Sequence, residues 1–365
     1  MDNAQRSFTV SPTTLTLLQT HRDTLIADVN RQMERRPDLD RLIGPGNRDR
    51  MRNNHENHLD YVISLCAQGS LESLEDTLRW VYRAYLRRGF SCAYFPVELD
   101  CWTRAYSMHL PPERAGELLP LYRQMNALHE PLLASDRENP GPSAGGPGPW
   151  TQNCQAFLER LLDGDYSGAL GLAGKRVHTR EDLPGFYQDV ITPCLYQIGD
   201  LWQDNMISVA HEHLATAIVS QLLAELYGRF AKLSPSRGTV LATTVAGEEH
   251  DTGLRMVADL LELDGWTVVY GGPARSDDEI ATLVRNHRPD LVVVSVTLVS
   301  SLHRLRALTT ALRRLPDTGT MAIFGGGQAT VHLPDPGAWG LDELQQTAEE
   351  AVKNARKWGS DHAHH

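Results

Sequence analysis

Apolar residues recur every three or four positions along the first third of the chain. This period matches the 3.6-residue turn of an amphipathic α-helix. Two stretches show it clearly, with Leu15, Leu17, Leu18, Leu25, Ile26 and Val29 in the first and Leu74, Leu78, Val81, Tyr82 and Tyr85 in the second. We therefore expect an all-α N-terminal domain over residues 1–137.

A run rich in proline and glycine, residues 138–149, follows this region and can continue neither a helix nor a strand. We interpret it as an interdomain linker. Residues 150–235 then show four further helical stretches, separated by Gly164, by Pro184-Gly185 and by the turn-like Asp204–Ser208. Four helices of this length predict a small four-helix bundle.

Short β-branched runs replace the helical pattern from Thr239 onward, and they alternate with helical segments. This alternation is typical of parallel strands joined by helices. The predicted strands are Thr239–Val245, Trp266–Tyr270, Leu291–Val296 and Met321–Phe324. Residues 236–357 are thus expected to form a Rossmann-like α/β domain, which makes the chain multidomain. We interpret residues 358–365, which end in histidines, as the remnant of an expression tag.

Composition narrows the functional classes. The 365 residues are 41% hydrophobic and 22% charged, as in ordinary folded proteins, and the formal net charge of −11 opposes binding to nucleic acid. No stretch is apolar enough to cross a membrane, and the N-terminus lacks the apolar core of a signal peptide, so we expect a cytoplasmic protein. The five cysteines are widely spaced, without a Cys-x-x-Cys pair, and predict neither a disulfide framework nor a zinc site.

Unusual loops follow three of the predicted strands, at the carboxyl ends where open α/β sheets bind their ligands. Taken alone, a loop histidine is more often an ordinary polar residue, and a glycine run after a strand is a weak signal for phosphate binding. The combination of all three loops is much more specific. They are Gly247–Gly253, Ser295–Ser301 and Phe324–Ala329.

Together the motifs Glu248-x-His250-x-x-Gly253, Ser295-x-Thr297 and Gly325-Gly326 resemble a cobalamin-binding domain. The resemblance implies that His250 ligates cobalt from below, in place of the cofactor's own dimethylbenzimidazole, whose tail inserts beside the sheet. Asp is commoner than Glu at position 248 in that family, but a Glu there can still accept the second imidazole N–H and raise the basicity of the ligand. The implied cofactor-binding residues are Glu248, Asp251, Gly253, Ser295, Thr297, Leu298, Ser301, Gly325, Gly326, Gly327 and Gln328.

The predicted bundle carries a second group of candidate residues. Trp202 closes its third helix, and Glu212 and His213 open the fourth after Ser208, a favourable N-cap residue. Taken singly, Trp202 fits core packing, and Glu212 fits an acid that stabilises the first turn of a helix. Their spacing resembles the cap of the cobalamin-dependent photoreceptors that regulate carotenoid genes.

That resemblance implies that the Trp202 indole lies over the upper face of adenosylcobalamin. The residues implied to line the same space are Gln203, Val209, Glu212 and His213. The best-known photoreceptor has a histidine at the position of Gln203, and that histidine captures cobalt after illumination. We therefore expect the lit state to lack a second imidazole ligand unless His211 or His213 supplies one. Those regulators also carry a basic winged-helix module, whereas the first domain here has no DNA-reading motif, so we expect no nucleic-acid partner.

A helical domain placed before such a bundle resembles the photocobilins, photoreceptors that hold both cobalamin and a biliverdin. A linear tetrapyrrole needs aromatic walls, cations for its propionates and an acceptor for its pyrrole N–H groups. The segment from Tyr85 to Tyr106 offers all three. Two alternatives remain open, namely a helix pair packed through its aromatics and a haem site with His109 or His129 as iron ligand. The candidate biliverdin-binding residues are Tyr94, Asp100, Cys101, Trp102, Arg104 and Tyr106.

These resemblances predict a light sensor and not an enzyme. They imply that light cleaves the cobalt–carbon bond of adenosylcobalamin, that the adenosyl group leaves the space under Trp202, and that domains and subunits repack. We expect a light-dependent homo-oligomer, a downstream effector domain or protein, and no membrane partner. One alternative is a corrinoid methyl-carrier protein of a methyltransferase system, in which Glu248, His250 and Ser301 tune the cobalt. Another is a cobalamin-sensing adaptor that does not respond to light.

Overall fold

The structure is a computed structural model that describes residues 8–71, 73–138, 152–230, 236–274, 276–316, 318–333 and 335–362. The chain divides into two compact units, Met1–Gly146 with Gln203–Met206 and Pro147–Trp202 with Ile207–His365. Apart from Glu138, the predicted linker lies outside the described residues. Among the helices in these ranges, none is long and apolar enough to cross a membrane.

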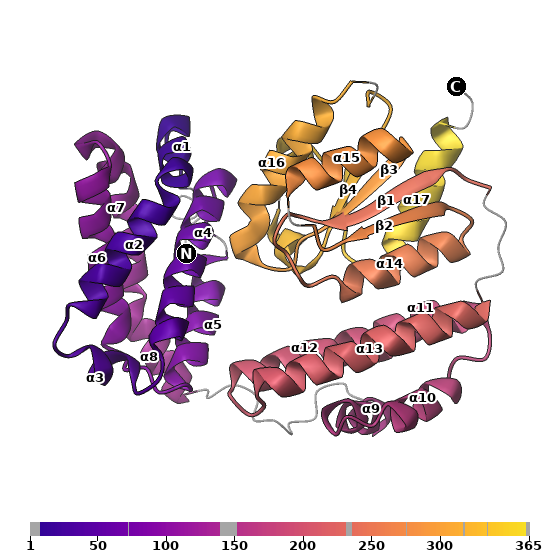
Figure 1. Ribbon diagram of the computed structural model, residues 1–365, viewed down its shortest axis with the longest axis horizontal. Helices are drawn as coiled ribbons and strands as arrows, with labels where there is room; N and C mark the ends of the chain where they lie inside the picture. The colour runs from indigo at the N-terminus through magenta and orange to yellow at the C-terminus, as the bar shows by residue number, and fades with distance from the viewer. Residues whose placement is uncertain are drawn as a thin grey trace. The chain divides into compact units, whose positions relative to one another are not determined.

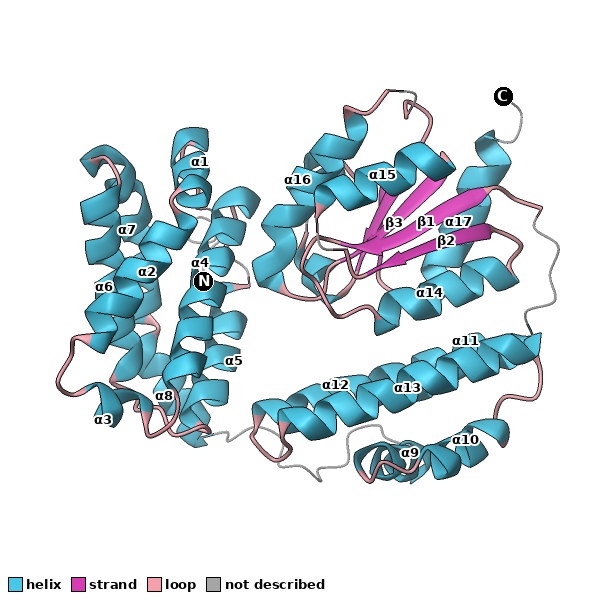
Figure 2. Ribbon diagram, in the orientation of Figure 1, coloured by secondary structure: helices cyan, strands magenta, loops and turns pink. Residues whose placement is uncertain are grey.

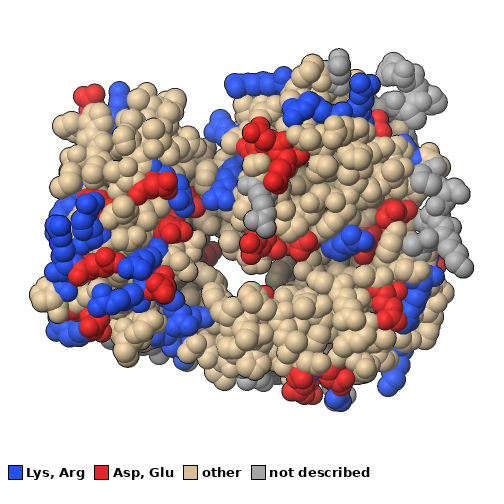
Figure 3. Space-filling model, in the orientation of Figure 1, with Lys and Arg blue, Asp and Glu red and all other residues tan. Residues whose placement is uncertain are grey.

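The first unit forms eight α-helices over its described residues, which confirms the all-α prediction (Figure 1). Ser11 caps the first helix by accepting a hydrogen bond from the Thr14 amide (3.2 Å). Arginines and carboxylates alternate over the visible face of this unit, and pairs such as Arg52–Glu34 (2.6 Å) join neighbouring helices (Figure 3). The helices are α1 (Pro12–Thr20), α2 (Arg22–Glu34), α3 (Leu39–Ile43), α4 (Arg48–Gln68), α5 (Leu74–Leu86), α6 (Tyr94–His109), α7 (Pro112–Ala127) and α8 (His129–Glu138).

A buried carboxylate, Glu98 of α6, lies in the core of the first unit. It is 3% exposed and accepts hydrogen bonds from Asn54 Nδ2 (3.0 Å) and Trp102 Nε1 (3.3 Å). Burial raises the pKa of Glu98 to about 7. Asn54 also donates to the Tyr94 hydroxyl (3.0 Å), which lies 3.2 Å from His55 Nε2. This core therefore contains a continuous polar network among its aromatic rings.

Two histidines of α4 extend the network. His55 Nδ1 lies 2.6 Å from Asn30 Oδ1, and His58 Nε2 lies 2.7 Å from the Tyr122 hydroxyl. The Tyr122 hydroxyl in turn lies 2.8 Å from that of Tyr106. Burial lowers the pKa of both histidines to about 3, so both rings are neutral at physiological pH.

The described residues of the second unit begin with four helical segments, which confirms the predicted bundle. α11 and α12 form one continuous segment joined by a π-turn at Tyr187–Ile191. The predicted break at Pro184-Gly185 is wrong, because Pro184 lies in the first turn of α11. Backbone N–H groups in a first turn make no hydrogen bond within the helix, so a proline costs nothing there. The helices are α9 (Gln152–Leu162), α10 (Tyr166–Gly174), α11 (Leu183–Phe186), α12 (Thr192–Gln203) and α13 (Val209–Phe230).

Five parallel strands in the order β2-β1-β3-β4-β5 form the sheet of the α/β domain. They are β1 (Thr239–Thr244), β2 (Thr267–Gly272), β3 (Leu291–Ser295), β4 (Ala322–Gly326) and β5 (Glu343–Gln345). The fifth strand was not predicted, because its three residues include no β-branched side chain. Helices α14 and α17 cover one face of the sheet, and α15 and α16 cover the other (Figure 2). These helices are α14 (Thr252–Leu263), α15 (Asp277–His287), α16 (Leu302–Arg313) and α17 (Ala348–His362).

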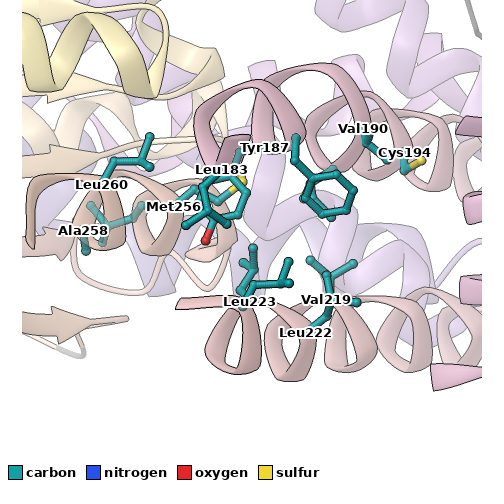
Figure 4. Close-up of a cluster of buried hydrophobic side chains, with 14 of the residues drawn as sticks. Leu183, Tyr187, Val190, Cys194, Val219, Leu222, Leu223, Met256, Ala258 and Leu260 are labelled. Atoms are coloured by element: carbon teal, nitrogen blue, oxygen red, sulfur yellow. The ribbon is translucent and has the colours of Figure 1, made fainter. Parts of the chain in front are cut away.

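The bundle and the sheet share one hydrophobic core, which joins them through α14 (Figure 4). Tyr187 and Val190 enter it from the third helical segment, Leu222 from α13, and Met256 and Leu260 from α14. The same cluster continues to the strands that α14 covers. The bundle is therefore packed as a third layer against the helices of the α/β domain.

Replacing Glu98 with Gln should remove a pH dependence of stability. The folded pKa of about 7 lies above the ordinary value of 4.5, so the carboxyl contributes stability that is complete below about pH 4.5 and is lost as the pH rises to about 7. The shift corresponds to about 3 kcal/mol. We expect urea unfolding between about pH 5 and about pH 8 to show a smaller loss of stability in Glu98→Gln than in the unaltered chain.

Glu130→Gln is the matched control, because the Glu130 side chain is 86% exposed in the same unit. It should leave the pH dependence of unfolding unchanged. An unchanged pH dependence in Glu98→Gln would show that this carboxyl is ionised in the folded protein throughout the range.

Candidate functional site

The carboxyl ends of β1, β3 and β4 lie side by side and in register. Thr244 pairs with Ser295, and Ser295 pairs with Gly326. β1 and β3 are neighbours in the sheet, and the strand order reverses between them, which is the switch point where open α/β sheets bind their ligands. The three loops singled out in the sequence therefore start from one edge of the sheet.

Glu248 joins the first of these loops to the second. It is 1% exposed, and its Oε2 accepts hydrogen bonds from the backbone N–H groups of Thr297 (3.1 Å) and Leu298 (2.9 Å). Its Oε1 accepts the N–H of His250 (3.1 Å) and lies 2.5 Å from His250 Nδ1. The carboxylate thus orients the imidazole and leaves Nε2 as the ring nitrogen that can bind a metal.

The two side chains stabilise each other's charge. Burial raises the pKa of Glu248, whereas hydrogen bonds from His250 and from the Leu298 N–H lower it. The lowering effects together are larger, so the pKa lies below the usual value. The hydrogen bond to Glu248 raises the pKa of His250, burial opposes this shift, and the nearby Glu212 adds to it. His250 itself is 56% exposed, so it stands at the surface of the loop above a buried acceptor.

The third loop approaches the second closely at Gly327. Its φ of 97° favours glycine, and a Cβ there would come within 2.4 Å of the Val296 carbonyl oxygen. Gly325 and Gly326 end β4, whereas Gln328 is exposed. A Cβ at Gly325 would meet the side chain of Leu341 at 2.6 Å, so the space beside this glycine is filled by the protein's own packing.

The remaining candidates of the first two loops differ in exposure. Ser295 and Ser301 are buried, Asp251 and Thr297 are half-buried, and Gly253 and Leu298 are exposed. Asp251 Oδ2 accepts a hydrogen bond from the hydroxyl of Tyr270 (2.9 Å). The sequence analysis missed Tyr270, although its place near the carboxyl end of a predicted strand was a usable signal.

The bundle brings Glu212 and His213 to the first turn of α13, directly after the Ser208 cap. Glu212 Oε2 lies 2.6 Å from His213 Nδ1, and the His213 side chain is 74% exposed. Trp202 is half-buried in the last turn of α12, at the same end of this helix pair. The charge of Glu212 also contributes to the raised pKa of His250.

Two other residues of this predicted set lie on either side of the α12–α13 turn. Val209, the first residue of α13, is 46% exposed. Gln203 groups with the first unit, where it is 7% exposed and its Nε2 donates to the Trp80 carbonyl oxygen (3.3 Å). His211 Nδ1 lies 2.7 Å from Ser208 Oγ.

The candidate biliverdin residues fall on two faces of α6. Tyr94, Trp102 and Tyr106 lie in the polar and aromatic core, and Cys101 is also buried, with its Sγ 3.6 Å from Met33 Sδ. The Asp100 and Arg104 side chains are each 58% exposed and form an ion pair with each other. The three aromatic residues therefore lie on the buried face of α6, and Asp100 and Arg104 lie on its exposed face.

The two histidines of the haem alternative also have protein partners. His109 Nε2 lies 3.4 Å from Asp28 Oδ2, and His129 Nδ1 lies 2.9 Å from the Tyr82 hydroxyl.

The His250 imidazole, with Nε2 as the ring nitrogen that can bind a metal, fits a cofactor that carries its own metal. Exposed apolar side chains of this unit include Leu298 (42% exposed) of the second loop, Val331 (53%), which follows the third loop, and Leu214 (44%) of α13. Within the part of the chain that the structure describes, no group of three or more His, Cys, Asp or Glu side chains could hold a metal ion.

Comparison with known families agrees with this fit. Residues 238–354 match a family model described as a B12 binding domain, and residues 154–227 match a second model with the same description. The chain carries two B12-binding domains. The matches indicate a cobalamin or related corrinoid as cofactor.

Three known proteins are similar to the chain. HTH-type transcriptional repressor CarH of Myxococcus xanthus is 30% identical over 146 residues, which cover 40% of this chain and 48% of the repressor. CarA, an HTH-type repressor of the same organism, is 26% identical over 39% of this chain and 49% of its own length. Corrinoid protein DSY3155 of Desulfitobacterium hafniense (strain Y51) is 23% identical over 54% of this chain and 94% of that protein. The chain thus spans about half the length of each repressor.

Solved structures of corrinoid proteins are also similar. The monomethylamine corrinoid protein of Methanosarcina barkeri gives a TM-score of 0.47 at 17% identity, over 55% of this chain and 95% of that one. A cobalamin-binding protein from D. hafniense DCB-2 gives 0.30 at 20% identity, over 56% and 98%. At these scores the likeness adds nothing to the assignment made from the family models.

Replacing Glu248 with Gln should weaken cobalamin binding. An amide cannot accept hydrogen bonds with both of its heavy atoms, so the variant loses either the orientation of His250 or the tie to the second loop. We expect the affinity for cobalamin, measured by titration of the corrin absorbance, to fall about 10- to 100-fold.

Glu249→Gln changes the same charge at the next residue, which is exposed, and should bind cobalamin nearly as well as the unaltered chain. Equal affinities of the two variants would show that the buried carboxylate does not support the B12 site.

Proposed function

We propose that this chain is a light sensor that binds adenosylcobalamin between the His250 loop and the Trp202 end of the bundle. When bound, this cofactor supplies a light-sensitive cobalt–carbon bond. His250 would hold the cobalt through Nε2, and Glu248 holds the imidazole in the orientation for that contact. Trp202, Glu212 and His213 would line the space for the adenosyl group.

The observation that carries this proposal is the orientation of His250 by the buried Glu248 carboxylate, which leaves Nε2 as the ring nitrogen that can bind cobalt. The core that the bundle shares with α14, the helix that follows this loop, supports a contact of the bundle residues with the same cofactor. Glu212 also raises the pKa of His250. Loss of the adenosyl group would empty the space between them and alter how the bundle packs, and we infer that subunit assembly changes as a result.

We further propose that the first unit holds a biliverdin. The resemblance to photocobilins and the aromatic core around Trp102, Tyr94 and Tyr106 support this part. His55 and Glu98 already bond to Asn30, Tyr94, Asn54 and Trp102, so a biliverdin in this core would have to replace these protein partners. The exposed Asp100–Arg104 ion pair lies outside this core.

A corrinoid methyl carrier is the second candidate, and one observation favours it. The chain aligns with 94% of the length of a corrinoid protein, but with only about half of each repressor. In that function His250, Glu248 and Ser301 tune the cobalt for methyl transfer, and Trp202 has no contact to make with an adenosyl group.

The spectrum of the loaded protein tests the sensor proposal. The chain is mixed in the dark with adenosylcobalamin and biliverdin, desalted, and measured before and after green light. We expect retained corrin bands that change irreversibly on illumination, retained red absorbance from the biliverdin, and a changed oligomer mass in light scattering.

His250→Ala is the control for the ligand assignment, because it removes the imidazole and keeps the loop. Its dark spectrum should lose the features of an imidazole-ligated cobalt. In the unaltered chain, retained corrin bands that do not change on illumination would contradict the sensor proposal. They would favour a cobalamin-sensing adaptor or a methyl carrier. Loss of red absorbance alone would remove only the biliverdin part.

Replacing Trp202 with Ala separates the sensor from the methyl carrier. If the indole covers the adenosyl group, the variant should lose its preference for adenosylcobalamin over methylcobalamin, with an affinity loss for the adenosyl form of about 10-fold or more. Tyr196→Ala is a matched control, since Tyr196 is a 55% exposed aromatic residue of the same helix. An unchanged preference in Trp202→Ala would favour the carrier.

A further inference from the structure

A series of polar contacts links the His250 loop to the bundle without using Trp202 or Glu212. It begins at Asp251, the residue that directly follows the proposed cobalt ligand. The hydroxyl of Tyr270, on β2, donates to Asp251 Oδ2 (2.9 Å) and lies 3.5 Å from the Asp251 carbonyl oxygen. One side chain of the neighbouring strand therefore restrains both the side chain and the backbone of Asp251.

Arg255 continues the series along α14. Its guanidinium carbon lies 4.7 Å from the centre of the Tyr270 ring, within cation–π range. Its Nε lies 2.9 Å from Asp259 Oδ1, one helical turn further along α14. The Asp259 side chain is fully buried, so this ion pair lies partly inside the core shared by the bundle and the sheet.

Tyr187 completes the series on the bundle side. Its hydroxyl donates to Asp259 Oδ2 (3.3 Å), and the residue is 1% exposed. Tyr187 is the first residue of the π-turn between α11 and α12, a helical irregularity that occurs frequently at functional sites. The contact ties this irregularity directly to the helix that follows the His250 loop.

These polar groups cross a core that is otherwise apolar (Figure 4). A buried ion pair is weak evidence for stability, because well-packed apolar side chains of similar volume often stabilise a fold as well or better. Hydrogen bonds and ion pairs do restrict orientation more than apolar contacts. The residues Tyr187, Asp259, Arg255, Tyr270 and Asp251 are therefore suited to holding the π-turn and the His250 loop in one fixed relation.

We propose that Tyr270 is a positioning residue for His250, and that Arg255 and Asp259 couple it to Tyr187 in the bundle. The inference rests on the proposed function, because it takes His250 as the cobalt ligand. Tyr270 fixes Asp251 and so limits the movement of the adjacent imidazole. A displacement of the bundle at Tyr187 reaches the same loop through α14.

Tyr270→Phe tests the positioning role in the full chain, since it removes only the hydroxyl. The first measurement is amide hydrogen exchange of residues 248–253 without cobalamin. The second is the affinity for adenosylcobalamin, with the absorbance signature of imidazole ligation. We expect about fivefold faster exchange in the loop and about fivefold weaker binding, the effect of one lost hydrogen bond.

Tyr227→Phe is the matched control. Tyr227 also lies under the Arg255 guanidinium (5.9 Å) and is half-buried, but its hydroxyl bonds Glu262 and not the His250 loop. It should change neither the loop exchange nor the affinity. Equal effects of the two variants, or no effect of Tyr270→Phe, would overturn the positioning role.

Tyr187→Phe tests the coupling to the bundle, because it breaks the series at its far end. We expect faster exchange in residues 248–253 here as well, in the same direction as in Tyr270→Phe. Unchanged loop exchange in Tyr187→Phe would overturn the coupling and leave Tyr270 as a local positioning residue. If the unaltered chain fails to bind cobalamin, the proposed function fails, and the inference fails with it.

Discussion

The burial of one ionised carboxylate governs the arrangement of the candidate B12 site. A carboxylate as buried as Glu248 must be hydrogen-bonded to remain charged, and its partners come from two separate loops. The Thr297 and Leu298 amides hold the second loop against the first, while His250 is held in the orientation that a metal ligand needs. The orientation of the ligand and the closure of the loops are therefore consequences of the same requirement.

The position of the bundle follows from a different interaction, the apolar core that it shares with the sheet. α14 lies between the two and contributes Met256 and Leu260 to that core. Because this helix also begins directly after the His250 loop, the packing of the bundle and the placement of the ligand depend on one element. The bundle contacts α14 mainly through apolar side chains, which do not fix its orientation. The polar contacts from Tyr187 to Tyr270 restrict that orientation.

The fold was largely predictable because its signals are local. Four strands and the helices follow from the spacing of apolar side chains, whereas β5 has too few residues to leave a pattern. The three loops of the candidate B12 site could be singled out because each follows a predicted strand, but the bonds from Thr297 and Leu298 to Glu248 depend on strand order, which no local pattern contains. The place of Tyr270 at the end of a predicted strand was a local signal, but its contact with Asp251 again depends on which strands are neighbours. In α6, a spacing of four residues joins Tyr94, Glu98, Trp102 and Tyr106 on one face, so helical geometry separates them from Asp100 and Arg104.

The register of the sheet has a consequence for how such a site can diverge. Thr244, Ser295 and Gly326 end their strands at one level, so the three loops start from a common baseline. A longer loop then extends further from the carboxyl edge of the sheet than a shorter one, without any change in the strands. A sheet of this kind acts as a fixed frame on which loops can be exchanged between related proteins, and its specificity can change while its core stays the same.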